Sequence, residues 1–378
     1  MSTTGSPDGT ADPTSDVAAA LREAAFVRLV AAADGDALAA LGVLADTLGA
    51  AGTPFQATVT PLPEPADRAT DVDLTLALGR PAAAADATLG VDGVASSATH
   101  EVAGELGPPG FDPDAVLATA GALAAETVPA DLAAPVEEAG LEHRPGLAGP
   151  TDDPVDALAH STLLCAPVSG DPEAAADLLG DVETADMDDD ARRRVASLAA
   201  LVVAGDADGT SRGAEAVERF LRPYAGGPFG TLGGYGDVLD ALARTRPGLG
   251  VAVALGAGDG EAALSAWREH GRRAHRAVGA ARTGRYDGLF AVRCDGDVPA
   301  GTVARLVRDF RSPEPVVLVV ADGEAAAVRT PEASLDVGTA MAAAAETVAG
   351  TGGGTTTRGR AVFEAEDSAF VVAFREAQ

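Results

Sequence analysis

The chain contains no lysine, so each of its 27 basic residues is an arginine. It has only two cysteines, Cys165 and Cys294, which excludes a disulfide framework and a paired-cysteine metal site. Aromatic residues make up 4% of the chain and are scattered, so no stacking platform for nucleic-acid bases is expected. No apolar run approaches the ~18 residues that a transmembrane helix needs, and the N-terminus lacks the basic and apolar regions of a signal peptide. We therefore expect a cytoplasmic protein that does not contact a membrane.

Acidic residues dominate the charge. The 57 aspartates and glutamates against 27 arginines give a net charge of −30. Such a charge repels itself at low ionic strength and is screened by salt, which is typical of cytoplasmic proteins of salt-in halophiles. A disordered acidic chain is the alternative, but apolar runs such as residues 316–320 favour a folded protein. With 378 residues, the chain is long enough for two domains.

Strand-like and helix-like segments alternate along the chain. Apolar runs at residues 26–31, 55–60, 72–79 and 87–92 predict strands, and helical segments follow them, which favours a buried, mainly parallel sheet. A second α/β pattern begins with a predicted strand at residues 251–256. We predict two α/β domains joined by a helical connector. The expected division is a flexible acidic tail (1–20), a first domain (21–165), the connector (166–248) and a second domain (249–378).

Two aspartates follow the first strand. Asp34 and Asp36 lie in a short turn between this strand and a predicted helix, at the strand end where ligands of parallel α/β sheets bind. Two carboxylates one residue apart can converge on Mg²⁺ or Mn²⁺. They can equally cap the helix, because carboxylates satisfy its free N–H groups and the positive end of its dipole. From these residues alone, capping is favoured.

This turn resembles the first motif of the DHH phosphoesterase superfamily, to which RecJ nucleases belong. That motif is His-x-Asp-x-Asp after a strand, and here Ala32 replaces the histidine while both aspartates remain. The later metal-ligand motifs are also incomplete. Asp92 is retained in the third motif, and the ligand positions that have changed are Ala77, Gly93, Val94 and Ala125. The resemblance implies a RecJ-like protein from an archaeon, expected to be a haloarchaeon, with degenerate catalytic motifs.

The loss of ligands bears directly on catalysis. A two-metal phosphoesterase holds its cations roughly 3.5–4 Å apart and needs several carboxylate or imidazole ligands. Asp34, Asp36 and Asp92 would hold at most one Mn²⁺ or Mg²⁺, and binding of no metal is the favoured expectation. The resemblance therefore predicts a catalytically inactive member.

The C-terminal part resembles the DHH-associated domain that faces the substrate in this superfamily. Arg329 matches an arginine of a hairpin strand. The Gly-Gly-Gly-His loop corresponds to Gly352, Gly353 and Gly354, with Thr355 in place of the histidine. The resemblance implies that these residues bind phosphate. Independently of it, consecutive glycines let backbone N–H groups approach an anion. The alternative is a flexible helix end of the kind that glycine often forms.

Arginines also recur on one predicted helix. Arg268, Arg272, Arg273 and Arg276 share a face by their spacing, and Arg305, Arg308 and Arg311 do so on the next helix. A solvated helix face is the favoured interpretation, and a nucleic-acid contact is the alternative.

Three functions follow from these observations. The first is an inactive RecJ-like protein that binds single-stranded nucleic acid or joins a replication or repair complex. Inactive RecJ relatives occur in archaeal and eukaryotic replication helicase complexes with GINS-type proteins, so the resemblance implies a partner of that type. The second is a Mn²⁺- or Mg²⁺-dependent phosphoesterase or single-strand exonuclease. The third is a nucleotide-binding protein that uses the cleft between domains without chemistry.

Overall fold

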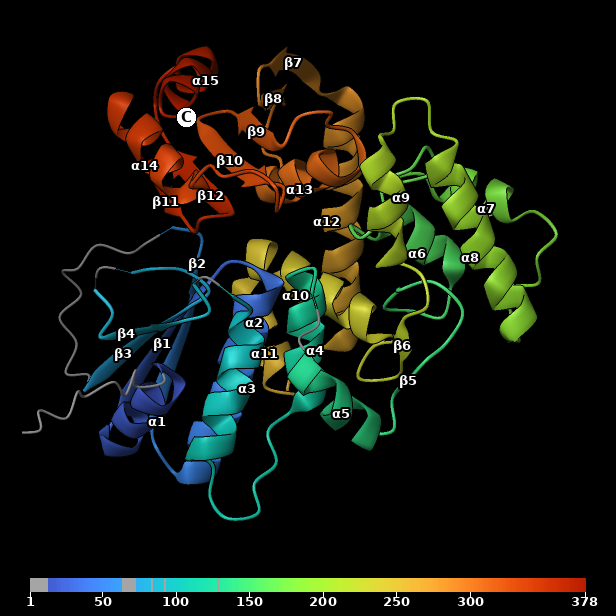
Figure 1. Cartoon of the computed structure of the whole chain (residues 1–378). Helices are drawn as coiled ribbons and strands as arrows, with labels where there is room; N and C mark the ends of the chain where they lie inside the picture. Colours follow the sequence, from blue (N-terminus) through green and yellow to red (C-terminus); the bar gives the residue numbers. More distant parts are fainter. Residues whose placement is uncertain (1–12, 63–72, 83, 92, 128–129) are drawn as a thin grey trace, which may run out of the picture.

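The structure is a computed structural model of the chain. It describes residues 13–62, 73–82, 84–91, 93–127 and 130–378. Figure 1 shows an N-terminal α/β part in blue and cyan, a C-terminal α/β part in orange and red, and a group of green helices at their side. The protein therefore has the two-sheet α/β architecture that the sequence predicts.

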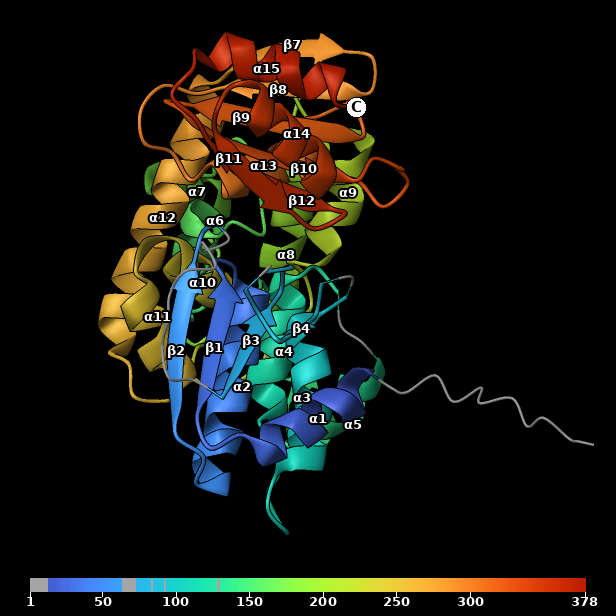
Figure 2. The same ribbon diagram turned by 90° about the vertical axis from the view of Figure 1, so that its left-hand side faces the viewer.

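The N-terminal sheet has four parallel strands in the order β2-β1-β3-β4. The strands are β1 (Val27–Ala32), β2 (Phe55–Thr60), β3 (Leu74–Leu78) and β4 (Ala87–Leu89). All six residues of β1 are buried, as expected for a central strand covered on both faces. Figure 2 shows that the carboxyl ends of these strands point toward the C-terminal part of the molecule. The prediction of a buried parallel sheet is confirmed.

Five helices accompany this sheet. They are α1 (Pro13–Glu23), α2 (Gly35–Ala51), α3 (Ala95–Leu106), α4 (Ala115–Ala124) and α5 (Ala130–Glu138). The predicted tail was too long, because its residues from 13 onward belong to α1. Val17, Ala18 and Leu21 lie on one face of α1 and are buried in the core of the sheet domain. The remainder of the predicted tail, residues 1–12, lies outside the described residues.

The middle of the chain is mainly helical. Its elements are β5 (Glu142–His143), α6 (Pro154–His160), α7 (Pro172–Leu179), α8 (Asp189–Ala204), α9 (Ser211–Glu218), β6 (Tyr224–Ala225), α10 (Leu232–Thr245) and α11 (Pro247–Ala254). The strand predicted at residues 251–256 was wrong, because α11 covers most of it. Pro247 opens this helix, where its fixed φ favours helical backbone. A short apolar run fits a buried helix as well as a strand.

The C-terminal part is built on a mixed six-stranded sheet in the order β11-β12-β10-β9-β8-β7. Its strands are β7 (Arg282–Tyr286), β8 (Leu289–Arg293), β9 (Val316–Ala321), β10 (Glu324–Arg329), β11 (Thr351–Gly354) and β12 (Arg358–Val362). Its helices are α13 (Ala300–Phe310), α14 (Val337–Thr347) and α15 (Asp367–Glu376), and the long helix α12 (Gly260–Ala280) leads into it. The predicted Asp-Gly hairpin is confirmed, since Asp322 and Gly323 both have positive φ, 45° and 82°.

The predicted glycine loop is a strand in the structure. β11 pairs with β12 in antiparallel register, with Gly353 opposite Arg360. The sequence signal failed because glycine has low strand propensity, whereas pairing with β12 and packing against α14 fix this segment.

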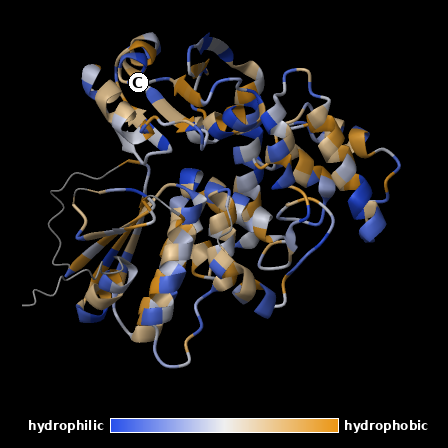
Figure 3. Ribbon diagram, in the orientation of Figure 1, coloured by the Kyte–Doolittle hydropathy of each residue, from blue (hydrophilic) through white to orange (hydrophobic). Residues whose placement is uncertain are grey.

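Both sheets have apolar strands, coloured orange in Figure 3, with more polar helices around them. Helix α12 packs against two groups of helices. Trp267 belongs to a core cluster shared with α10, and Ala274 to a cluster shared with α6 to α9. The domain limits at residues 165 and 248 stay a prediction. In the part of the chain that the structure describes, no helix is long and apolar enough to span a lipid bilayer.

Candidate anion-binding site

A cleft of about 850 Å³ lies between the two sheets. Its floor is formed by segments that follow the carboxyl ends of the N-terminal strands, including Asp34 after β1 and Arg80 after β3. Its opposite wall is formed by β10, β11 and β12 of the C-terminal sheet, and its side by α9 and α13. The cleft thus lies where the parallel sheet topology places a ligand site.

Arginines are concentrated in this cleft. Among the described residues that line it, nine are arginines and six are acidic. The arginines are Arg80, Arg212, Arg219, Arg244, Arg305, Arg308, Arg329, Arg358 and Arg360. The acidic residues are Asp34, Glu126, Glu215, Asp240, Asp309 and Glu332. One third of the 27 arginines thus faces the cleft with about one tenth of the 57 acidic residues, which reverses the charge balance of the whole chain.

The two aspartates of the first motif act as helix caps. Asp34 is the N-cap of α2 and accepts a hydrogen bond from the Ala37 N–H at 2.9 Å. Its other carboxylate oxygen lies 3.3 Å from the Arg358 guanidinium. Asp36 is buried, and its two oxygens accept hydrogen bonds from the N–H groups of Ala95 and Ser96, at 2.7 and 2.9 Å. Asp36 therefore caps α3, a different helix from its own.

Burial raises the pKa of Asp36 to about 6, and the nearby Asp34 carboxylate acts in the same direction. The hydrogen bonds from Ser96 and Ala95 oppose this shift because they favour the charged form. Asp34 lines the cleft and Asp36 does not. The carboxyl group of Asp36 thus lies in the protein interior.

The described residues do not fit a divalent metal ion. Both oxygens of Asp36 and one of Asp34 accept backbone N–H groups, and Arg358 places a positive charge beside the last oxygen. The neighbouring cleft positions carry the apolar side chains of Ala32, Val94 and Ala125. Within the described ranges, no three His, Cys, Asp or Glu side chains come together as metal ligands. The third predicted ligand, Asp92, lies outside the described residues.

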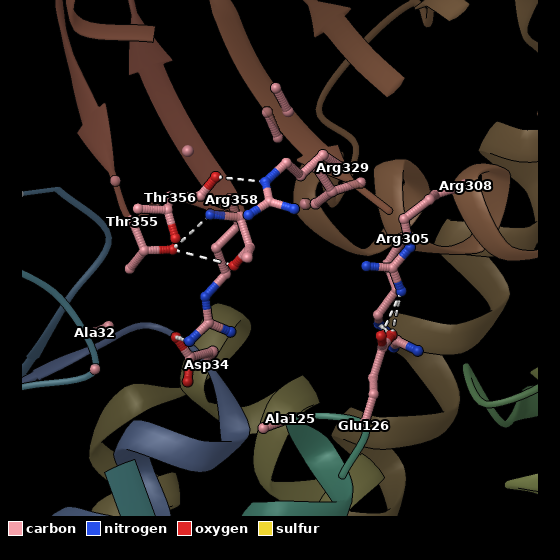
Figure 4. A pocket seen from close by; sticks show the side chains of 18 of the residues that line it. Ala32, Asp34, Ala125, Glu126, Arg305, Arg308, Arg329, Thr355, Thr356 and Arg358 are labelled. Atoms are coloured by element: carbon pink, nitrogen blue, oxygen red, sulfur yellow. Dashed lines mark hydrogen bonds and ion pairs between the residues drawn. The ribbon is translucent and has the colours of Figure 1, made fainter. Parts of the chain in front are cut away.

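The predicted phosphate-binding residues form the C-terminal wall of the cleft. The Arg329 guanidinium donates hydrogen bonds to the carbonyl oxygens of Thr356, Thr330 and Pro331, at 2.9, 3.0 and 3.2 Å. Thr355 is mostly buried, and its hydroxyl lies 3.3 Å from that of Thr357. Figure 4 shows Arg329, Thr355, Thr356 and Arg358 grouped on this wall above Asp34.

The three glycines have different surroundings. A Cβ atom on Gly354 would lie 2.1 Å from the Arg358 carbonyl oxygen, and one on Gly352 would lie 2.7 Å from that of Met341. A Cβ atom on Gly353 would meet nothing within 4 Å. Gly353 and Gly354 line the cleft, whereas Gly352 packs against α14 and is not among the lining residues. Close packing against the backbone therefore explains why positions 352 and 354 are glycine.

A group of charged residues on the side of the cleft was missed by the sequence analysis. Glu126, directly after Ala125, lines the cleft and contacts Arg308 and Arg219. The partners come from α9 and α13, about 90 and 180 residues further along the chain, so no local pattern could have indicated them. The repeat of Arg305 and Arg308 on one helix face was the one available signal.

The arginines of α12 lie outside the cleft. Arg268 donates hydrogen bonds to both carboxylate oxygens of Asp156, Arg272 pairs with Glu269 at 3.0 Å, and Arg273 with Asp297 at 2.8 Å. Arg276 is exposed. These pairs agree with the solvated-face interpretation and give no support for a nucleic-acid contact on this helix.

Comparison with solved structures identifies the fold. Crystal structures of CDC45 from Entamoeba histolytica and of RecJ from Thermus thermophilus in complex with Mn²⁺ match nearly the whole chain. The CDC45 match has a TM-score of 0.59 at 9% identity and covers 96% of this chain and 98% of CDC45. The RecJ match has a TM-score of 0.48 at 14% identity and covers 97% of this chain, which spans about half (55%) of the length of that RecJ. The CDC45 match shows that the protein shares the two-part α/β fold of that structure.

Sequence comparison identifies the family. Residues 281–376, from just before β7 through α15, match a domain described as "Uncharacterized protein rrnAC1427, C-terminal domain". A relative of Haloarcula marismortui, the uncharacterized protein rrnAC1427, is 51% identical over 382 residues, covering 100% of both chains. Since identity at this level extends over the full length of both proteins, the chain belongs to the family of Haloarcula marismortui rrnAC1427.

Proposed function

We propose that this protein is a RecJ-like protein without metal-dependent hydrolysis that binds single-stranded nucleic acid through its phosphates, as a component of a replication or repair complex. The concentration of arginine in the cleft carries this proposal. A cleft with nine arginines and six acidic residues, in a chain of net charge −30, attracts a polyanion where the rest of the surface repels it.

The chemistry of the lining favours phosphate over base recognition. The described residues that line the cleft include no aromatic side chain, and the chain has no asparagine and only two glutamines. Stacking and amide contacts to base edges are thus not provided there. Arginine is well suited to phosphate, because its planar guanidinium donates two parallel hydrogen bonds to phosphate oxygens.

The residues at the floor of the cleft support the proposed lack of hydrolysis. Ala32, Val94 and Ala125 supply no ligand, and Asp34 and Asp36 cap helices. We propose single-stranded nucleic acid as the ligand and a GINS-type protein as the partner because of the resemblance to RecJ relatives.

Binding can be tested by fluorescence anisotropy with a fluorescein-labelled 20-nucleotide oligo(dT). The titration is repeated over a series of KCl concentrations at which circular dichroism shows folded protein. We expect binding that weakens as KCl rises, because phosphate contacts release counterions. Inorganic tripolyphosphate should compete with the oligonucleotide. Absence of binding at every such KCl concentration would overturn the proposal.

Hydrolysis is tested with the same oligonucleotide, end-labelled and incubated with Mn²⁺. We expect the strand to stay intact. The control is Asp34→Asn, since asparagine also caps helices. Cleavage by the wild type that this variant abolishes would instead establish the phosphoesterase or exonuclease alternative.

A further inference from the structure

Glu126 has a backbone conformation that disfavours a side chain. It follows the last turn of α4 with φ of 68°, and its N–H donates to the Leu123 carbonyl oxygen at 3.0 Å, as in a helix-ending turn. Glycine is the usual residue at such a position, because other residues are strained there. A carboxylate is also unfavourable at the negative end of a helix dipole. Local structure therefore opposes glutamate at this position, and its partners must account for it.

Those partners are three arginines that converge on one carboxylate. Arg308 donates to both carboxylate oxygens of Glu126, at 2.6 and 2.5 Å. Arg219 lies 3.0 Å from the same carboxylate, and Arg305 lies 4.0 Å from it. Burial alone would raise the pKa of Glu126, but the three guanidinium groups outweigh it and lower that pKa to about 2. Glu126 is therefore ionised under all ordinary conditions.

This cluster belongs to the cleft. Glu126 and the three arginines all line it, and Figure 4 shows Arg305 and Arg308 above Glu126, across the cleft from Arg329 and Arg358. Arg219 and Arg308 also contact Asp309, at 2.6 Å each, so part of their charge stays balanced without Glu126. Arg308 donates from Nη2 to both oxygens of Glu126 and from Nε to Asp309. A guanidinium group that bonds a carboxylate in this way can also bond a phosphate.

We propose that Arg219, Arg305 and Arg308 form a second phosphate-binding site in the cleft, and that the Glu126 carboxylate fills this site in the wild type as an internal competitor of a ligand phosphate. The inference rests on the proposed function, because it needs a phosphate-bearing ligand in the cleft. It adds to that function a second phosphate contact, at the three arginines, and a residue that limits affinity, Glu126.

The decisive variant is Glu126→Gln, assayed with the labelled oligo(dT). It frees the three arginines, so we expect binding about tenfold tighter, the gain of one charged hydrogen-bonded contact. The plot of log affinity against log salt should steepen by about 0.7, the value for one more phosphate of a single strand. Glu215→Gln is the matched control. Glu215 lines the same cleft and forms no ion pair with the described residues, so this variant removes the same charge and should leave the salt slope unchanged.

Arg308→Gln completes a double-mutant cycle. In the wild type, Glu126 already occupies Arg308, so this substitution should change affinity little. In the Glu126→Gln background, it should remove most of the gain. If Glu126→Gln alone does not fold, the double variant should still bind more tightly than Arg308→Gln, because Arg219 and Arg305 stay free of Glu126.

The outcomes separate the two proposals. If the wild type and all variants bind nothing, the proposed function fails. If the wild type binds and folded Glu126→Gln matches Glu215→Gln in affinity and salt slope, the internal-competitor proposal fails and the proposed function stands.

Discussion

Helix α12 and the β10–β12 wall of the cleft both carry several arginines, but they use them differently. On α12, Arg268, Arg272 and Arg273 each pair with a nearby carboxylate, and none lines the cleft. On the wall, Arg329 bonds only to backbone carbonyl oxygens among the described residues, and Arg358 has one carboxylate at 3.3 Å. The spacing of charges along a chain indicates a shared face, whereas tertiary neighbours decide whether that face is neutralised.

The inner face of α12 confirms its structural role. Trp267 is buried and donates a hydrogen bond to Asp237 at 2.8 Å, and His270 and His275 of the same helix are also buried. Gly271 lies so close to α6 that a Cβ atom would be 1.8 Å from the His160 carbonyl oxygen. The contrast predicts that substitutions on the inner face of α12 affect stability and that substitutions of the wall arginines affect ligand binding.

Acidification should give the largest loss of stability, because α12 carries two buried histidines. Burial lowers the pKa of His270 to about 3 and that of His275 to about 4, from about 6.5. The charged groups near His270 are Asp240, Arg244, Arg305 and Arg273, and those near His275 are His160 and Arg305. As the pH falls, the two histidines are protonated in the unfolded chain before they are protonated in the folded one. Their contribution to the free energy of unfolding is therefore fully present above pH 6.5 and decreases below it. At pH 5 we expect a loss of about 2 kcal/mol for each histidine.

Urea unfolding at pH 7 and pH 5 measures this loss, with His270→Gln/His275→Gln as the comparison. The variant should lose less stability between the two values. Asp36 acts in the opposite direction, because its raised pKa of about 6 makes the folded protein more stable as the pH falls below 6. An equal loss in wild type and variant would show that the histidines are not the cause.

Substitution of the wall glycines should give the next largest effect. Gly354→Ala places a Cβ atom 2.1 Å from the Arg358 carbonyl oxygen, so we expect a loss of about 3 kcal/mol in the free energy of unfolding. Gly353→Ala meets open space and should cost less than about 1 kcal/mol, mainly through strand propensity. Thermal unfolding of the two variants measures these losses, and equal losses would contradict the close packing around Gly354.

Removal of two wall arginines should weaken binding without unfolding the protein. For Arg329→Gln/Arg358→Gln we expect about 30-fold weaker oligo(dT) binding, equivalent to about 2 kcal/mol, and a smaller salt slope. The matched control is Arg272→Gln/Arg276→Gln, which removes two arginines of α12 and should leave affinity nearly unchanged. Comparable losses in both variants would place the ligand outside the cleft or show that overall charge alone decides binding.

The smallest effect is expected for Arg268→Gln. Arg268 bonds to Asp156, but its side chain is 36% exposed, so solvent screens the pair. We expect a loss of less than about 1 kcal/mol in urea unfolding and unchanged oligo(dT) affinity. A clear loss of affinity in folded protein would return α12 to the candidate binding surface.

The sequence predicted those features that depend on local patterns. The strand, turn and helix around Asp34 were located correctly, and capping was the favoured role for both aspartates. The sequence could not indicate that Asp36 caps α3, because Ala95 and Ser96 lie about 60 residues further on. The motif comparison also placed Ala32, Ala125 and Thr355 at one site, and all three line the same cleft.

The failures have physical causes of two kinds. Residues 251–256 were predicted as a strand, because a short apolar run does not distinguish a strand from a buried helix. The role of Glu126 was missed because it depends on contacts between α4, α9 and α13. Whether Asp92 takes part in the site stays a prediction, since it lies outside the described residues.

The composition of the cleft lining determines which conditions can regulate it. Its charged groups, among the residues described, are arginines, aspartates and glutamates, without lysine, histidine, cysteine or tyrosine. Arginine keeps its charge at all physiological pH values, and carboxylates with ordinary pKa values are ionised above about pH 6. Acetylation of lysine, which removes a positive charge from many proteins, has no target in this chain. The proposed attraction of the cleft for anions should therefore be constant between about pH 6 and pH 10, and ionic strength should be the condition that changes it.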